Sequence, residues 1–131
     1  MNSLNLEEGL FPEQFFSSQD GATLLRVVGS QATTIDAVSK EEISMLDLRG
    51  PAISATISNH RAWVAAALET LLATDIYQYK REGEKWSMVL LQRLRGLVQS
   101  VQWEETDDSR YPPTELKVEK RDGTTMILMP K

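Results

Sequence analysis

Apolar residues occur in short runs along this chain, and the pattern within each run predicts an element. The run ATLLRVVG (22–29) is bounded by glycines, and TTIDAVS (33–39) alternates loosely after it, so we expect two paired strands. LVQSVQWEE (97–105) predicts a further strand. No internal repeat is visible in the sequence.

A first helix is predicted over 40–48. Ser39 and Glu42 have the spacing of a capping box, in which the hydroxyl and the carboxylate each satisfy a free backbone amide. Gly50 and Pro51 then end the helix.

A second helix is predicted over 59–73. Its apolar residues recur at helical spacing, and the run of alanines at 65–67 has high helix propensity. The residues expected on its buried face are Val64, Leu68, Leu71 and Leu72. The preceding segment 52–58 either extends this helix or forms a strand, and we favour the extension.

Residues 75–96 allow two interpretations. A hairpin would turn on Gly83-Glu84 and pair two residues of each arm, Tyr79 with Met88 and Tyr77 with Leu90. Alternatively, a strand at 75–80 precedes a helix at 85–95 that ends at Gly96. Because the unbranched LLQRLR has helical propensity, we favour the strand followed by a helix.

A β-hairpin is predicted at the end of the sequence, formed by TELKVEK (114–120) and TTMILM (124–129). Asp122-Gly123 is the signature of a two-residue type I′ turn. That turn would pair Val118 with Ile127 and leave Met126 and Leu128 on the opposite face. A strand that is apolar on both faces is usually buried on both faces. The predicted helices or another chain would cover the second face.

Together these elements predict an α+β fold: a small, mostly antiparallel sheet with a C-terminal β-hairpin, covered by two or three helices. Residues 1–21 form a loosely ordered N-terminal segment, and 22–131 form a single α+β domain. A chain of 131 residues is long enough to bury a core without disulfides.

Composition and charge limit the classes of function. The chain has no cysteine, which excludes disulfides, thiolate metal sites and cysteine nucleophiles. Its net charge of −5 argues against general binding to a phosphate backbone. The start of the sequence lacks a basic region and carries Glu7 and Glu8, and no apolar run reaches the roughly 20 residues that span a bilayer. We therefore expect a cytoplasmic protein with no membrane partner.

Motifs for catalysis or cofactor binding are absent from the sequence. There is no glycine-rich phosphate loop and no G-x-S-x-G elbow, so no cofactor or metal is expected. His60 is the single histidine and the one candidate general base. An enzyme using His60 would need an acid from elsewhere in the fold.

A nucleic-acid-binding domain is the first alternative function. Basic residues cluster at Lys80, Arg81 and Lys85 beside aromatic residues, and again at Lys120 and Arg121 in the predicted hairpin. Glu82 and Glu84 weaken the first cluster, and this alternative requires both clusters to converge on one face.

The large apolar side chains favour a protein partner. Aromatic residues and methionines are enriched at binding surfaces, and the candidate partner-binding residues are Phe15, Phe16, Trp86, Met126 and Leu128. The sequence therefore predicts a non-enzymatic interaction module: an assembly factor, adaptor or small acidic chaperone of a microbial or viral system. It would offer an apolar sheet face or edge to a protein partner of unknown identity, or to a second copy in a homodimer.

Overall fold

The computed structural model describes residues 12–71, 73–105 and 112–131. The regular secondary structure in these ranges consists entirely of β-strands. The eleven strands are β1 (Glu13–Ser17), β2 (Thr23–Val28), β3 (Gln31–Asp36), β4 (Glu42–Asp47), β5 (Ala52–Ile57), β6 (Trp63–Glu69), β7 (Ala73–Glu82), β8 (Lys85–Arg95), β9 (Val98–Glu104), β10 (Glu115–Lys120) and β11 (Thr125–Leu128).

The predicted α+β fold is wrong, because the described chain is all-β. The segments predicted as helices, 40–48, 59–73 and 85–95, instead contain strands β4, β6 and β8. The segment 52–58, for which we favoured a helical extension, contains strand β5. In the N-terminal segment 1–21, for which loose order is predicted, residues 1–11 lie outside the described ranges and Glu13–Ser17 forms β1.

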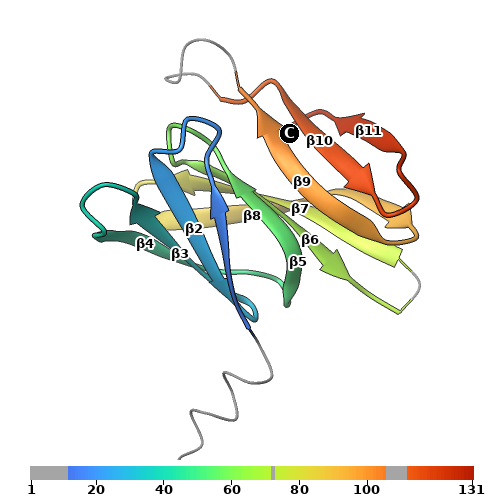
Figure 1. The fold of residues 1–131 in the computed structure, drawn as a ribbon, viewed down its shortest axis with the longest axis horizontal. Helices are drawn as coiled ribbons and strands as arrows, with labels where there is room; N and C mark the ends of the chain where they lie inside the picture. Colours follow the sequence, from blue (N-terminus) through green and yellow to red (C-terminus); the bar gives the residue numbers. More distant parts are fainter. Residues whose placement is uncertain (1–11, 72, 106–111) are drawn as a thin grey trace, which may run out of the picture.

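The strands form three antiparallel sheets in which successive strands pair with each other. Sheet A contains β1 to β4, sheet B contains β5 to β8, and sheet C has the order β11-β10-β9. In Figure 1, the blue-to-teal strands of sheet A and the orange-to-red strands of sheet C lie on opposite sides of the green strands β5 and β6. The fold is therefore three layers, each made by local hairpins.

Sheet B is the middle layer, and strand β6 is buried on both of its faces. Its alternate residues enter two separate cores: Trp63, Ala65 and Ala67 pack with residues of sheet C, whereas Val64, Ala66 and Leu68 pack with residues of sheet A. A strand covered on both faces is apolar at every position rather than at every second one. The small alanines leave room for the large side chains of the outer layers.

Sheet C is fastened to sheet B through hydroxyl groups of β5. The backbone amide of Val101 donates to Ser54 Oγ at 3.1 Å, and the amide of Trp103 donates to Thr56 Oγ1 at 3.3 Å. These two amides of β9 point away from β10, so the buried hydroxyls satisfy what would otherwise be unpaired edge donors.

The hairpin alternative for residues 75–96 is confirmed, and the predicted helix at 85–95 is wrong. Strands β7 and β8 pair Tyr79 with Met88 and Tyr77 with Leu90. Gly83 has a φ of 66° in the tight turn between them. This conformation suits glycine because it lacks a Cβ atom.

The C-terminal hairpin is also confirmed, but its predicted register is wrong by one residue. Val118 pairs with Met126 and Leu116 with Leu128. The Gly123 amide donates to the carbonyl of Lys120, and Gly123 alone in this loop has a positive φ, so the loop spans 121–123 rather than two residues. A one-residue shift exchanges the two faces of a strand.

The shifted register decides which apolar residues of β11 are covered. Leu128 is buried and Met126 packs against the core between sheets B and C. Ile127 and Met129 instead remain exposed, by 47% and 65%.

Candidate interaction groove

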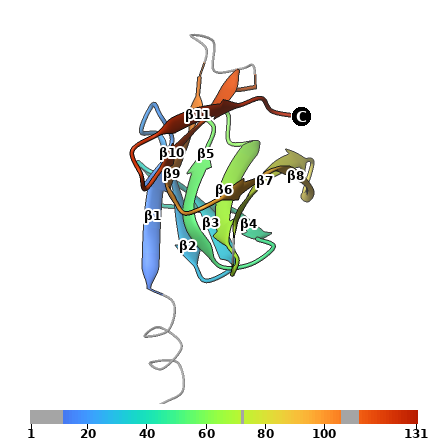
Figure 2. The ribbon, with the colours of Figure 1, turned by 90° about the vertical axis from the view of Figure 1, so that its right-hand side faces the viewer.

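Two sheet edges lie on the same side of the molecule. Strand β4 is the last strand of sheet A and β8 is the last strand of sheet B, and no described strand pairs with their outer sides. Figure 2 shows β1 and β8 at opposite sides of the molecule, so this side is far from the N-terminal strand. Unpaired strand edges carry rows of free backbone donors and acceptors.

A hollow of about 370 Å³ separates these two edges. It is lined by Met45, Leu46 and Asp47 from β4 and by Tyr79, Trp86 and Met88 from the β7–β8 hairpin. Met45 and Met88 are 56% and 47% exposed, respectively, although both are large apolar side chains. Methionine is flexible and polarizable, and it is common on surfaces that bind apolar segments.

A second hollow of about 290 Å³ lies farther along the same hairpin. Its lining includes Arg49, Pro51, Leu68, Tyr77 and Arg93. The rings of Tyr77 and Tyr79 lie 6.5 Å apart, one in each hollow. We refer to the two hollows together as the β4–β8 groove.

The second hollow contains the ion pair between Arg93 and Asp75. Arg93 Nε and Nη2 donate to the two carboxylate oxygens at 2.7 and 3.0 Å. The hydrogen bonds from Arg93 lower the pKa of the buried Asp75 carboxyl group, and they raise the pKa of Arg93 in turn. This side-on pairing fixes the guanidinium and leaves the N–H groups of Nη1 for another acceptor.

Tyr79 closes the floor of the first hollow. Its hydroxyl accepts a hydrogen bond from the backbone amide of Arg49 at 2.8 Å, and only 1% of the residue is exposed. Burial raises the pKa of this phenol. The tyrosine thereby connects sheet B to the segment that follows β4.

The five candidate partner-binding residues do not come together. Trp86 lines the groove. Phe15 is 54% exposed on β1, and Phe16 points the other way, into the core between sheets A and B. Met126 and Leu128 pack in the core on the sheet C side. Met45 and Met88 also line the groove, and they were not among the five predicted residues.

The basic clusters also lie apart. Lys80, Arg81 and Lys85 flank the turn between β7 and β8. Arg121 donates its amide to the carbonyl of Leu97, which follows the other end of β8. The length of β8, roughly 30 Å at about 3.3 Å per residue, separates the two clusters. The convergence required for a nucleic-acid groove is therefore not found.

His60 lies in the loop between β5 and β6, not in a helix. Its Nδ1 is 2.6 Å from Ser58 Oγ and accepts a hydrogen bond from the amide of Ala62. Burial lowers the pKa of His60, so the neutral ring is favoured. Ser58 is completely buried and its hydroxyl also accepts from the amide of Trp63, so it is not presented to a substrate.

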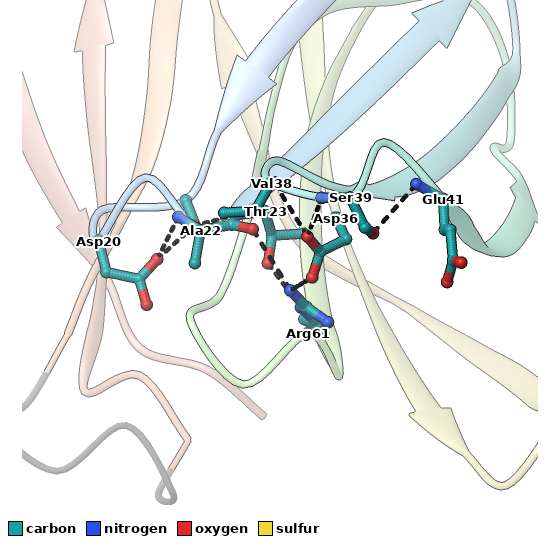
Figure 3. A network of polar contacts seen from close by, with 9 residues as sticks. Asp20, Ala22, Thr23, Asp36, Val38, Ser39, Glu41 and Arg61 are labelled. Atoms are coloured by element: carbon teal, nitrogen blue, oxygen red, sulfur yellow. Dashed lines mark hydrogen bonds and ion pairs between the residues drawn. The ribbon is translucent and has the colours of Figure 1, made fainter.

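The neighbouring Arg61 connects two layers of the fold (Figure 3). Its guanidinium donates to Asp36 Oδ2 on β3 and to Thr23 Oγ1 on β2, both at 2.7 Å. Amides of Ser39 and Val38 donate to the other oxygen of Asp36. The Ser39 amide, Arg61 and the Val38 amide together hold the pKa of Asp36 well below its ordinary value. This polar cluster is a structural clamp between sheets A and B.

The described residues contain no cluster of three or more His, Cys, Asp or Glu side chains placed to hold a metal ion. Nor do they form a helix long and apolar enough to cross a membrane. Comparison with known proteins finds neither a family model nor a curated protein that matches this chain.

Proposed function

We propose that this protein is a non-enzymatic interaction module that binds an extended segment of a protein partner in the β4–β8 groove. One observation carries the proposal: Met45, Trp86 and Met88 line a hollow directly beside the unpaired edge of β8. Exposed apolar side chains next to a free strand edge are the two requirements for recognition by strand addition.

Strand β8 is suited to this mode of binding because of its length. It spans eleven residues, and most of them are exposed. A partner strand would gain backbone hydrogen bonds along β8, while its alternate side chains would enter the hollows. Trp86, Met88 and Leu90 pair with Arg81, Tyr79 and Tyr77, so all three lie at alternate positions on the groove side of β8.

The two alternative functions have weaker support. The basic clusters lie at opposite ends of β8, and the groove between them carries acids as well as bases, with Asp47, Glu69 and Asp75 in its lining. The hydroxyl beside His60 is buried, and the imidazole stabilises a turn. Both features favour structural roles for these residues.

A peptide-library selection tests the proposal even though the partner is unidentified. Immobilised wild-type protein would be compared with Met88→Glu and with the control Ile127→Glu, because both residues are 47% exposed but Ile127 lies on β11, outside the groove. We expect extended apolar peptides to be enriched on the wild type and the control but not on Met88→Glu. Enrichment that is equal on all three proteins, or on none, contradicts the proposal.

Amide chemical shifts would then locate the bound peptide. Binding in the groove should perturb residues of β4, β7 and β8 and leave β10 and β11 unchanged. Perturbation confined to sheet C or to the outer face of sheet A would place the interaction elsewhere.

A further inference from the structure

We infer that the partner segment is an extended strand whose groove-facing side is acidic at one end and apolar over the rest. This inference rests on the proposed function and specifies the chemistry of the occupant. It follows from the order of side chains along β8. On the groove side, the strand reads Trp86, Met88 and Leu90, then Arg93 and Arg95.

The charge of β8 has one sign. Its sequence KWSMVLLQRLR contains three bases and no acid. In an added strand, the residues directly opposite those of β8 are the nearest cross-strand neighbours. Opposite charges at such positions stabilise pairing and like charges destabilise it. Carboxylates are therefore favoured opposite Arg93 and Arg95.

The ion pair with Asp75 prepares Arg93 for this contact. The pair uses Nε and Nη2, and the side chain of Arg93 remains 65% exposed. A guanidinium that is already oriented loses little freedom when it binds a second carboxylate through Nη1. Arg95 and Lys85 are exposed at the two ends of the strand.

The β8 strand of a second copy is a poor occupant for the same reason. Full-length antiparallel pairing of two β8 strands would set Lys85 of each copy opposite Arg95 of the other. Both contacts are repulsive, and no acid on β8 offsets them. The edge thus disfavours itself while it favours an acidic partner.

The spacing of the partner follows from β7, which already pairs with β8. Along β7 the residues Ala73, Asp75, Tyr77, Tyr79 and Arg81 face the groove at regular intervals of two. Their partners on β8 are irregularly spaced, because β8 carries an extra residue at its bulge. A partner strand with regular alternation therefore needs acids at its first and third positions and apolar residues at its fifth, seventh and ninth.

Lys131 is the one described side chain that donates to a backbone carbonyl of β8. Its Nζ lies 3.2 Å from the carbonyl oxygen of Leu90, in an exposed position. The Gln78 amide holds the backbone of Lys131 through two bonds of 2.9 Å. Gln78 alternates along β7 with the groove-facing Tyr77 and Tyr79, so this lysine approaches β8 from the opposite face of sheet B.

The test uses two labelled nine-residue peptides whose termini are blocked. The acidic probe is Asp-Thr-Asp-Thr-Val-Thr-Val-Thr-Val, and its matched control has Lys in place of both Asp residues. Fluorescence anisotropy at low salt should show the full-length protein binding the acidic probe roughly tenfold more tightly than the lysine peptide. Added salt should reduce this preference.

Two charge-reversal variants assign the preference to β8. Arg95→Glu should remove most of the discrimination between the probes, whereas Lys117→Glu, the same change on an exposed position of sheet C, should preserve it. Equal affinity for both probes that is lost in Met88→Glu would overturn the acidic preference and keep the groove as the binding site. If neither probe binds at about 1 mM, both the preference and strand addition at β8 are wrong.

Discussion

Ser18 and Ser58 occupy the same position in two loops with the same hydrogen bonds. Each serine amide donates to a carbonyl five residues later, of Thr23 and Trp63, respectively, at 2.9 Å. Each serine hydroxyl in turn accepts a hydrogen bond from the backbone amide of that same Thr23 or Trp63. Each hydroxyl also lies 2.6 Å from the side chain two residues later, Asp20 or His60. Sheets A and B therefore begin with the same hairpin, although SQDGAT and SNHRAW share only serine and alanine.

The first prediction uses the correspondence of Asp20 and His60 in these loops. Asp20 Oδ1 and His60 Nδ1 make equivalent contacts, so the position requires an acceptor rather than an imidazole. The variant His60→Asn supplies a carbonyl oxygen that does not titrate. We expect this variant to fold, and we expect its stability to depend less on pH than the stability of the wild type does.

The direction in which stability changes with pH follows from proton linkage. Burial lowers the pKa of folded His60 below 6.5, so the unfolded chain binds a proton first as pH falls. The contribution of His60 to stability is thus complete above about pH 6.5 and declines below it. Urea unfolding of the wild type between about pH 7.5 and pH 5 should show this decline, and His60→Asn should show less of it. Parallel curves for the two proteins would contradict the prediction.

The second prediction separates backbone strain from side-chain contacts at Arg61, whose φ is 69°. Arg61→Ala and Arg61→Gly both remove the bonds to Asp36 and Thr23, so both should be less stable than the wild type. The left-handed conformation is strained for alanine but not for glycine. The free energy of unfolding of Arg61→Ala should therefore be about 1–2 kcal/mol lower than that of Arg61→Gly. Urea unfolding measures the difference, and equal stability of the two variants would show that the loop relaxes.

The third prediction concerns the attachment of sheet C. Thr56→Val keeps the shape of the side chain but removes the acceptor for the buried amide of Trp103. An unpaired buried donor costs about 1–3 kcal/mol, so the variant should lose that much stability. Thr56→Ser keeps the hydroxyl and should lose less. If valine were as stable as threonine, the hydrogen bond would not fasten β9 to β5.

Part of the fold could be predicted from the sequence because local patterns determine it. The strands near 22–29 and 97–105 and the C-terminal hairpin were found from apolar runs and turn residues. Strand β6 was not, because Val64 and Leu68 are four residues apart, and that spacing shares a face in both a helix and a strand. Alanine propensity then favoured a helix, whereas two covering layers favour the strand.

Strand β8 was wrongly predicted as a helix for a different reason. Leu91 and Leu94 share one core although they are three residues apart, which is a helical interval. The register of β8 shifts opposite Ile76 and Tyr77, and the extra residue at this bulge changes which face the later residues occupy. Sequence spacing alone cannot distinguish a bulged strand from a helix.

The groove was only partly predictable. Trp86 was selected as an aromatic anchor, and it does line the groove. Met45 and Met88 approach the same hollow only because two separate sheets stack with their last strands on one side. Such a convergence depends on the packing of layers, which no local pattern records. The short sequences ISML and WSMV around the two methionines were the available signal.

The last prediction tests the register of the C-terminal hairpin through Gly123. Its φ is 92°, and a Cβ atom added there would meet no other atom within 4 Å. Gly123→Ala should therefore lose stability through backbone strain alone, by about 1–2 kcal/mol. Gly123→Asn should lose less, because asparagine tolerates the left-handed region.

The same loop distinguishes the two possible turns through Asp122. In the observed three-residue loop only Gly123 needs a positive φ, and the Asp122 carboxylate accepts bonds from Thr124. A type I′ turn would require a positive φ at Asp122 as well. Urea unfolding of Asp122→Gly provides the discriminating control: the observed loop predicts lower stability, because the carboxylate is lost and the unfolded chain gains freedom. An increase in stability would instead support the two-residue turn and return Ile127 to the core.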